Sequence, residues 1–421
     1  MRGQQRGTFL FATVVAVLGF LMMTASAFAA GTEQVLLSFN YGGGTHPHAG
    51  LILDASGNLF GTTYTDGTYG AGTVFELLPG GGGQWGFEAL YNFCAVTGCF
   101  DGGLSESSLI FDAAGNLYGT TSQGGNSDGC GHGCGTVFKL TNSGGLWTET
   151  VLYSFSGGSD GGIPVAGLVF DAAGNLYGTT SAGGNSTYCA GGCGVIFRLR
   201  RAANGTWKEK VLHTFCAGTG CLGGGVPNGL TIDAKGNLYC TTNQLGLYGG
   251  GTVLRFAPGA NGGWTKKILH RFGKGTDGAS PYGELIFDAG GSLYGTTSKG
   301  GSHFSGTVFR LTPGTNDKWT EKILHTFCSS TNCADGALPY AGVTMNSAGT
   351  LFGTTYSGGA HSAGTVFTMT PDAKGRWTEA VLYDSGDNPD AALILDSAGN
   401  LYSTTMNGGD YRLGSVFEIT P

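Results

Sequence analysis

The sequence predicts an all-β protein, a seven-bladed β-propeller built from four-stranded antiparallel blades. Three observations predict this fold: one unit of about 55–60 residues recurs seven times, each copy contains four segments of strand-like composition, and helical periodicity is absent from the repeats. Four-stranded sheets repeated four to eight times around an axis are typical of propellers.

Two short markers define the repeat. The first resembles Gly-Asn-Leu-Tyr-Gly-Thr-Thr and starts at Gly57, Gly115, Gly174, Gly236, Gly291, Gly349 and Gly399. The second resembles Gly-Thr-Val-Phe and starts at Gly72, Gly135, Gly194, Gly251, Gly306, Gly364 and Gly414. Because a catalytic group is needed only once, features present in every copy are interpreted as architecture. The Asp that precedes the first marker in six copies is expected to cap the turn that follows it.

The second copy illustrates the four strands, which we expect at residues 109–112, 116–122, 136–140 and 147–155. Across the copies, the first segment is nearly free of charge before its terminal Asp, whereas the fourth carries Lys and Glu. An apolar strand suits the axis of a propeller, and a charged strand suits the rim, where it opposes edge-to-edge pairing. The first strand is therefore expected to be innermost and the fourth outermost.

The tryptophans and the chain ends predict how the ring closes. Each of the six tryptophans opens a fourth strand, where we expect it to pack between blades: Trp85, Trp147, Trp207, Trp264, Trp319 and Trp377. The seventh copy stops at residues 417–421 without such a strand, while residues 34–39 match the end of one. We therefore expect residues 33–39 to pair with residues 415–419 and to complete the last blade.

The first 30 residues are interpreted as a signal peptide, with Arg2 and Arg6 before an uncharged run at residues 9–23 and small residues at 25–29. Residues 31–421 are expected to form a single propeller domain that is exported to the cell surface or beyond. The net charge of −7 and the absence of a basic stripe argue against nucleic acid as a partner. We expect a monomer with no membrane span after removal of the signal.

Ten of the 11 cysteines fall in close pairs, which predicts five small-loop disulfides in an exported chain. The pairs are Cys94/Cys99, Cys130/Cys134, Cys189/Cys193, Cys216/Cys221 and Cys328/Cys333. Zinc is the competing interpretation, with Cys130-Gly-His-Gly-Cys134 as its best case. Cys240 takes the place of a repeat glycine and is expected to be a buried, inert thiol.

The combined motif set, Asp-x-x-Gly-Asn-Leu-Tyr-Gly-Thr-Thr, Gly-Thr-Val-Phe and Trp-x-x-x-Val-Leu-Tyr, resembles the choice-of-anchor tandem-repeat family named GloVer, the Gloeo/Verruco repeat. The resemblance covers about residues 33–421. It implies bacterial export and a C-terminal anchor, although no anchor motif is recognisable in this chain. The family label implies no defined activity.

One recurring feature indicates a binding site. A Tyr or His stands in the loop between the second and third strands, on the face expected to carry every cysteine pair. The candidates are Tyr69, His132, Tyr188, Tyr248, His303, His361 and Tyr411, with Tyr188 displaced by an insertion. Aromatic rims suit sugar rings, while the alternative is that each ring covers neighbouring glycines.

Singular residues are the candidates for chemistry. Glu284 replaces a small residue before the first strand of the fifth copy, and Glu106 lies before that of the second, so the two could form a carboxylate pair for glycoside cleavage. His46 and His48 flank Pro47, where a metal is a further speculation. No cofactor motif appears, and neither a cofactor nor a metal is expected. The favoured function is a binding or scaffold module for a glycan or a protein partner rather than an enzyme; the alternative is a carbohydrate-active hydrolase or lyase at the channel mouth.

Overall fold

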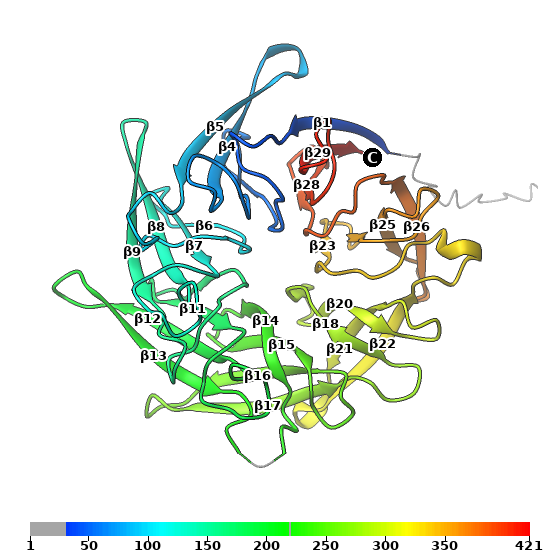
Figure 1. Ribbon diagram of the computed structural model, residues 1–421. Helices are drawn as coiled ribbons and strands as arrows, with labels where there is room; N and C mark the ends of the chain where they lie inside the picture. Colours follow the sequence, from blue (N-terminus) through cyan, green and yellow to red (C-terminus); the bar gives the residue numbers. More distant parts are fainter. Residues whose placement is uncertain (1–30, 219) are drawn as a thin grey trace, which may run out of the picture.

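The computed structural model describes residues 31–218 and 220–421, which form seven antiparallel sheets arranged as blades around one axis (Figure 1). This confirms the predicted fold class. The predicted signal peptide lies outside the described residues. Among the described residues, no helix is long and apolar enough to cross a membrane.

Each blade runs from an inner to an outer strand. The innermost strands are β2 (Ile52–Leu53), β6 (Ile110–Phe111), β10 (Val169–Phe170), β14 (Gly225–Ile232), β18 (Gly278–Pro281) with β19 (Ile286–Phe287), β23 (Thr344–Met345) and β27 (Ile394–Leu395). The second strands are β3 (Leu59–Thr62), β7 (Leu117–Thr121), β11 (Leu176–Thr180), β15 (Leu238–Gln244), β20 (Leu293–Gly300), β24 (Leu351–Thr355) and β28 (Leu401–Thr405). The third strands are β4 (Thr73–Pro79), β8 (Thr136–Ser143), β12 (Val195–Arg201), β16 (Thr252–Pro258), β21 (Thr307–Pro313), β25 (Thr365–Pro371) and β29 (Ser415–Thr420). The outer strands are β5 (Trp85–Asn92), β9 (Leu146–Ser154), β13 (Trp207–Thr214), β17 (Trp264–Arg271), β22 (Trp319–Thr326), β26 (Trp377–Asp384) and β1 (Thr32–Ser38). Short 3-10 turns lie at Gly81–Gly83, Thr315–Asp317 and Thr331–Cys333.

The outer strand of the seventh blade comes from the opposite end of the chain. β1 pairs antiparallel with β29, from Thr32 opposite Thr420 to Ser38 opposite Ser415, and the two strands lie side by side in Figure 1. Phe39, just beyond β1, is buried against Phe75 of the first blade. How much this strand contributes to holding the ring closed remains a prediction.

The apolar core lies between blades rather than within them. Phe155, at the end of the second blade's outer strand, packs edge-on against Phe197 in the third strand of the next blade, with ring centroids 5.0 Å apart. Trp147 lies 6.4 Å from Phe60 of the preceding blade, and Trp264, Trp319 and Trp377 take equivalent places against tyrosines. The tryptophans therefore contact the neighbouring blade, as the sequence predicted.

The two threonines of the first marker have different structural roles. The second threonine closes the loop between second and third strands; for example, Thr121 Oγ1 lies 2.9 Å from Thr136 Oγ1. The first threonine joins blades, since Thr354 Oγ1 donates to the Ala391 carbonyl of the next blade at 3.0 Å. Equivalent bonds to the next blade come from Thr62, Thr120, Thr179, Thr296 and Thr404. Thr241 is the exception, because its hydroxyl has no partner among the described residues.

The Asp residues cap their turns as predicted. Asp112 accepts hydrogen bonds from the backbone N–H groups of Ala114 and Asn116 at 2.9 and 3.0 Å. Asn346 makes the same backbone contacts in the sixth blade. The carboxylate therefore caps the turn, and the amide oxygen of Asn346 accepts the equivalent backbone hydrogen bonds.

The fourth blade packs the side chains of its second and third strands differently from the other blades. Elsewhere a small residue in the second strand faces a Phe in the third, as Gly178 faces Phe197, and a Cβ added to Gly178 would lie 2.5 Å from the Phe197 Cζ atom. In the fourth blade Cys240 faces Leu254, and both are fully buried. The larger second-strand residue is thus matched by a smaller third-strand residue.

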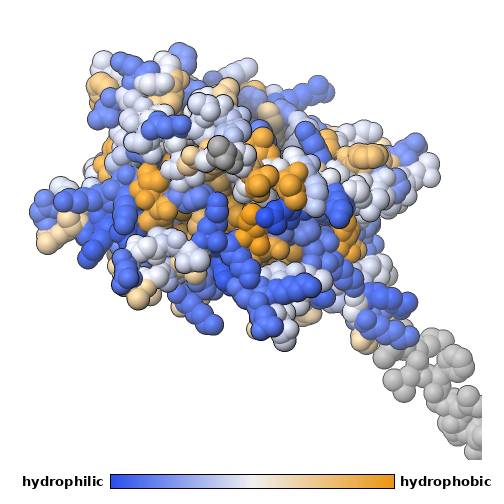
Figure 2. All heavy atoms as spheres, turned by 90° about the horizontal axis from the view of Figure 1, so that it is seen from below, coloured by the Kyte–Doolittle hydropathy of each residue, from blue (hydrophilic) through white to orange (hydrophobic). Residues whose placement is uncertain are grey.

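The outer edge of the ring carries both hydrophilic and hydrophobic residues. Figure 2, which views the molecule from the lower side of Figure 1, shows hydrophilic residues around a central zone of hydrophobic ones. Along β13, Lys208 and Lys210 are exposed. This distribution agrees with the expectation that the charged strands lie outermost.

Candidate functional site

All seven blades contribute to one cavity of about 570 Å³ on the axis, which we call the axial pocket. Its wall consists of the loops that enter the innermost strands, together with residues that directly follow two second strands, Tyr356 and Met406. These loops lie on the same side of the blades as the loops that carry the cysteine pairs.

One backbone conformation recurs in every blade and places a side chain in the wall of the pocket. In six blades a residue with positive φ precedes a proline, and the residue after that proline lines the pocket; in the second blade Ser105 replaces the proline. The positive-φ residues are His46, Leu104, Ile163, Val226, Ser280, Leu338 and Asn388, with φ between 53° and 57°. The pocket residues are His48, Glu106, Val165, Asn228, Tyr282, Tyr340 and Asp390.

Contacts with the preceding blade hold this backbone in place. The Ile163 N–H donates to the Cys134 carbonyl at 2.8 Å, and all seven positive-φ residues make the equivalent bond. Pro164 packs on Gly135, whose added Cβ would lie 2.7 Å from the proline Cδ and 2.2 Å from the Thr121 carbonyl oxygen. Such a backbone is strained for a β-branched residue such as Ile163, so the bonds to the neighbouring blade must maintain it. The scaffold is therefore constant, while the side chain that it presents varies.

The charged side of the pocket comes from three consecutive blades, the seventh, first and second. His48 Nδ1 lies 3.0 Å from Asp390 Oδ2, and both side chains are largely buried. Burial lowers the pKa of His48, but the hydrogen bond to Asp390 and the charges of Asp390 and Glu106 outweigh it and raise that pKa overall. Burial raises the pKa values of both Glu106 and Asp390, and the histidine offsets part of each shift.

The aromatic side of the pocket comes from the fifth and sixth blades. The Tyr340 ring lies between Tyr282 and Tyr356, with centroid distances of 5.6 and 5.5 Å and edge-to-face geometry in both pairs. Burial raises the pKa of Tyr282, and the charges of Glu106 and Asp390 raise it further. The two sides of the pocket therefore face one another closely enough to interact.

Glu284 occupies a position where the other blades have Gly, Ala or Ser. A Cβ added to Gly229 would lie 2.6 Å from Glu284 Cα, and one added to Gly167 would lie 3.0 Å from Glu284 Oε1. The carboxyl thus extends from the fifth blade toward the third across space that glycines leave free. Protein atoms surround it, and this burial raises its pKa to about 7, although the side chain stays exposed to the lumen and water there reduces the effect.

The structure brings some sequence candidates together and leaves others apart. Glu106, Glu284 and His48 share the axial pocket, whereas His46 does not line it and instead places Nδ1 2.9 Å from the Thr45 hydroxyl. Tyr282, Tyr340 and the other pocket residues were missed. The signal that could have found them is the proline repeated in six copies, followed by a residue that varies among copies, with Tyr in two of them.

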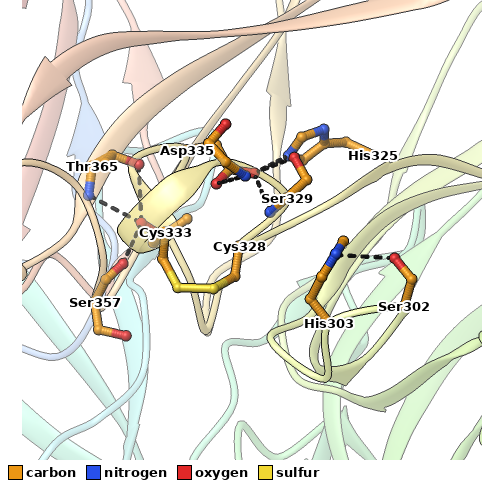
Figure 3. A network of polar contacts seen from close by, with 11 residues as sticks. Ser302, His303, His325, Cys328, Ser329, Cys333, Asp335, Ser357 and Thr365 are labelled. Carbon is orange, nitrogen blue, oxygen red and sulfur yellow. Dashed lines mark hydrogen bonds and ion pairs between the residues drawn. A yellow bond between two sulfur atoms is a disulfide. The ribbon is translucent and has the colours of Figure 1, made fainter.

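The Tyr/His candidates lie outside the axial pocket. Tyr69, His132, Tyr188, Tyr248, His303, His361 and Tyr411 are all exposed on their loops. Three of them make specific side-chain contacts. The Tyr188 hydroxyl accepts from the Gly220 N–H at 2.6 Å, Lys274 Nζ lies 5.9 Å from the centre of the Tyr248 ring, and the Ser302 hydroxyl lies 3.0 Å from His303 Nδ1 (Figure 3). Their role in binding remains a prediction.

The predicted disulfides are present in all five loops, and Cys240 is free and buried. Figure 3 shows one stapled loop, in which Asp335 accepts from the backbone N–H and hydroxyl of Ser329 at 3.0 and 2.8 Å beside the Cys328–Cys333 bond. His325 Nε2 lies 3.1 Å from the same carboxylate. This loop is thus held by side-chain bonds as well as by its disulfide.

Two groups of possible metal ligands occur among the described residues, and neither lies in the pocket. Cys189 and Cys193, close to Cys216, are bonded to each other. The second group is His270, Asp277 and Glu321, where Asp277 lies 3.0 Å from His270 Nε2. Other blades place Tyr or His here, and Tyr153 and His325 contact Asp160 and Asp335 in the same way, which favours a structural role.

Similar folds occur among solved structures, at identities that show the fold alone. An ancestral GH74 enzyme matches with a TM-score of 0.58 and 12% identity, over 93% of this chain and 51% of that one. A fungal alcohol oxidase of the AA5 family, in complex with copper, matches with a TM-score of 0.57 and 14% identity, over 93% and 77%. A protein from Lactobacillus plantarum matches with a TM-score of 0.53 and 14% identity, over 86% and 99%. No curated protein sequence gives a significant match.

The repeat itself identifies the family. The Gloeobacter/Verrucomicrobia repeat matches residues 22–222, 126–344 and 322–421, which together span almost the whole sequence. The chain therefore belongs to the Gloeobacter/Verrucomicrobia repeat family.

Proposed function

We propose that this chain is an exported carbohydrate-binding module whose ligand enters the axial pocket. The observation that carries the proposal is the pocket position after the proline. Seven copies of one backbone present seven side chains there, and polar or aromatic groups occupy six of the seven places. A repeat that served packing alone would need no such diversity at one position.

The dimensions and chemistry of the pocket suit a sugar. Its volume of about 570 Å³ falls within the usual range for small-molecule sites, roughly 300–1,000 Å³. Tyr340 and its two neighbours offer aromatic faces for the C–H face of a pyranose, and the opposite side offers Asp390, His48 and Glu106 for its hydroxyls. The exposed Tyr and His residues on the loops between second and third strands would extend the contact for a longer chain or for a protein partner.

The five disulfides support export. Disulfides persist in oxidising compartments outside the cytoplasm, and five loop-local bonds are typical of secreted or surface proteins. Together with the signal sequence expected in residues 1–30, they favour a location at the cell surface or beyond.

A second candidate is glycoside cleavage, because Glu106 and Glu284 border one cavity. Glycosidases use two carboxyl groups, one of which acts as the acid when its pKa is raised. Burial raises the pKa of Glu284, which is the direction that such an acid needs, although water in the lumen reduces the shift.

The test is a glycan array probed with residues 31–421, followed by titration of any ligand found. The pocket variant Tyr282→Ala/Tyr340→Ala should weaken binding by about tenfold or more, a loss of about 1.4 kcal/mol. The rim variant Tyr69→Ala/Tyr248→Ala/Tyr411→Ala is the matched control and should retain binding, with unchanged thermal melts showing that both variants fold.

The reverse result, with binding lost only in the rim variant, would move the site to the exposed loops. Release of shortened oligosaccharide that disappears in Glu284→Gln would favour the hydrolase. Failure to retain any glycan would overturn the proposal.

A further inference from the structure

We infer that the axial pocket selects a sugar that carries a protonated amine over neutral or acidic sugars of the same size. This inference rests on the proposed function and names its ligand class. It is carried by the charge balance of the pocket wall, by the lack of partners for its carboxylates, and by the arrangement of its tyrosines.

The charge balance is strongly one-sided. Three carboxyl groups line the pocket, Glu106, Glu284 and Asp390, and His48 is the basic side chain that faces them. Within the described part of the chain, no lysine or arginine lines the cavity. An acidic sugar would meet like charges without a cation to offset them, which is costly at short range.

Two of the carboxylates have oxygen atoms that can accept a hydrogen bond from a ligand. Asp390 contacts His48 through Oδ2, while its buried Oδ1 atom has no partner among the described residues. The Glu284 carboxyl is exposed to the lumen and makes no hydrogen bond or ion pair within the described residues. A buried charged or polar group gains most from a ligand that supplies the missing donor, and an ammonium group supplies three.

The tyrosines favour the same ligand. Tyr340, flanked edge-on by Tyr282 and Tyr356, gives the pocket an aromatic wall whose ring faces attract a cation. The carboxylates add to that potential. Burial, and then the charge of Glu106, raises the pKa of both Tyr64 and Tyr282. The aromatic wall and the carboxylate wall thus attract a cation from opposite sides.

A bare metal ion fits the pocket less well than an organic cation. No three ligand atoms of its His, Asp and Glu side chains lie within 4.8 Å of one another among the described residues, since the two groups that do so lie elsewhere. The carboxylates are instead spread around a space of about 570 Å³, which suits a ligand of sugar size. The buried Nδ2 atom of Asn228 has no partner among residues 31–218 and 220–421, so it adds a donor for a hydroxyl of that ligand.

The experiment compares four tetrasaccharides by calorimetric titration into residues 31–421 at about pH 6, where the probe amine is protonated. An ammonium group bound beside Glu284 lowers the pKa of that carboxyl and so favours its charged form. The probes are β-1,4-linked glucosamine, its N-acetylated form, the glucose tetramer and a galacturonic acid tetramer. We expect the glucosamine tetramer to bind at least about tenfold more tightly than the glucose tetramer, and the galacturonic acid tetramer to bind most weakly. Glu284→Gln should reduce that ratio several-fold.

Glu88→Gln is the matched control, because it removes the same charge from an exposed outer-strand position. It should leave the ratio unchanged, and thermal melts of both variants check their folding. If the neutral or the acidic tetramer binds as tightly as the glucosamine tetramer, the inference is wrong and the carbohydrate site stands. If none of the four binds but the array retains another glycan, the inference is wrong and the carbohydrate site stands. If the array also retains no glycan, the proposed function itself fails.

Discussion

Substituting Cys240 by Gly and Leu254 by Phe would give the fourth blade the inner packing of most other blades. Cys240 faces Leu254 in the ladder between β15 and β16, and both side chains are fully buried. In five other blades a glycine faces the phenylalanine at this place, and a Cβ on Gly61 would lie 2.6 Å from the Phe75 ring. The two differences in the fourth blade should therefore compensate each other.

The magnitudes follow from the buried volumes. Leu254→Phe alone forces a ring against the Cys240 side chain, an overpacking that typically costs about 1–3 kcal/mol. Cys240→Gly alone leaves a small cavity and adds backbone freedom, for a loss of about 1–3 kcal/mol. In the natural chain Phe215 contacts Phe256. In the double variant the new ring at position 254 fills the cavity and reaches Phe215. The double variant should then lie within about 1 kcal/mol of the natural chain, a coupling of about 2 kcal/mol or more.

The assay is urea unfolding of the four proteins of this double-mutant cycle, followed by tryptophan fluorescence. Strictly additive losses would refute the reasoning, because they would mean that the residues at 240 and 254 do not share one packing site. Ser403, which faces Phe417 in the seventh blade, sets a useful limit, since it shows that a small Cβ substituent and a phenylalanine can coexist there.

Three further predictions concern stability and covalent structure. Burial, and then the charge of Asp335, raises the pKa of Glu379 to about 7. The protonated Glu379 side chain therefore contributes fully to the stability of the folded protein below its unfolded pKa, and this contribution is lost as the pH rises through about 7. Glu379→Gln should flatten the fall in Tm between about pH 5 and pH 8, and an unchanged slope would contradict this. Deleting residues 32–38 should expose the edge of β29 and lower Tm by about 5 °C or more, with partial rescue by an added peptide of that sequence, whereas an equally stable truncation would end the closure argument. Peptide mapping without reduction should recover five disulfides, each within one loop, and peptides that link different blades would contradict this. Cys240 should resist thiol reagents until the chain unfolds, because it is buried and burial raises its pKa. Labelling of Cys240 in the folded chain would be incompatible with this packing.

Most of the scaffold was predictable because each element repeats. The strands expected at residues 109–112, 116–122, 136–140 and 147–155 correspond to β6–β9 with small shifts at their ends. Seven copies reveal which positions are architectural, so the turn-capping Asp residues and the inter-blade tryptophans could be recognised without coordinates.

The pocket could not be predicted in the same way, because its members are the residues that do not repeat. His48 and Asp390 are 342 positions apart in sequence and meet only because the first and seventh blades are neighbours in the ring. Glu106 and Glu284 belong to blades that are not neighbours, which made a shared site look remote. Near the axis, however, loops from all blades converge, and both residues border one cavity.

The most direct test of the central claim, that the axial pocket is the ligand site, is a crystal structure of residues 31–421 with bound glucosamine oligosaccharide. We predict electron density for a sugar ring against Tyr340, with its amine within hydrogen-bonding distance of Asp390 or Glu284. Sugar density on the exposed rim at Tyr69, Tyr248 or Tyr411, with no sugar in the axial pocket, would contradict the account.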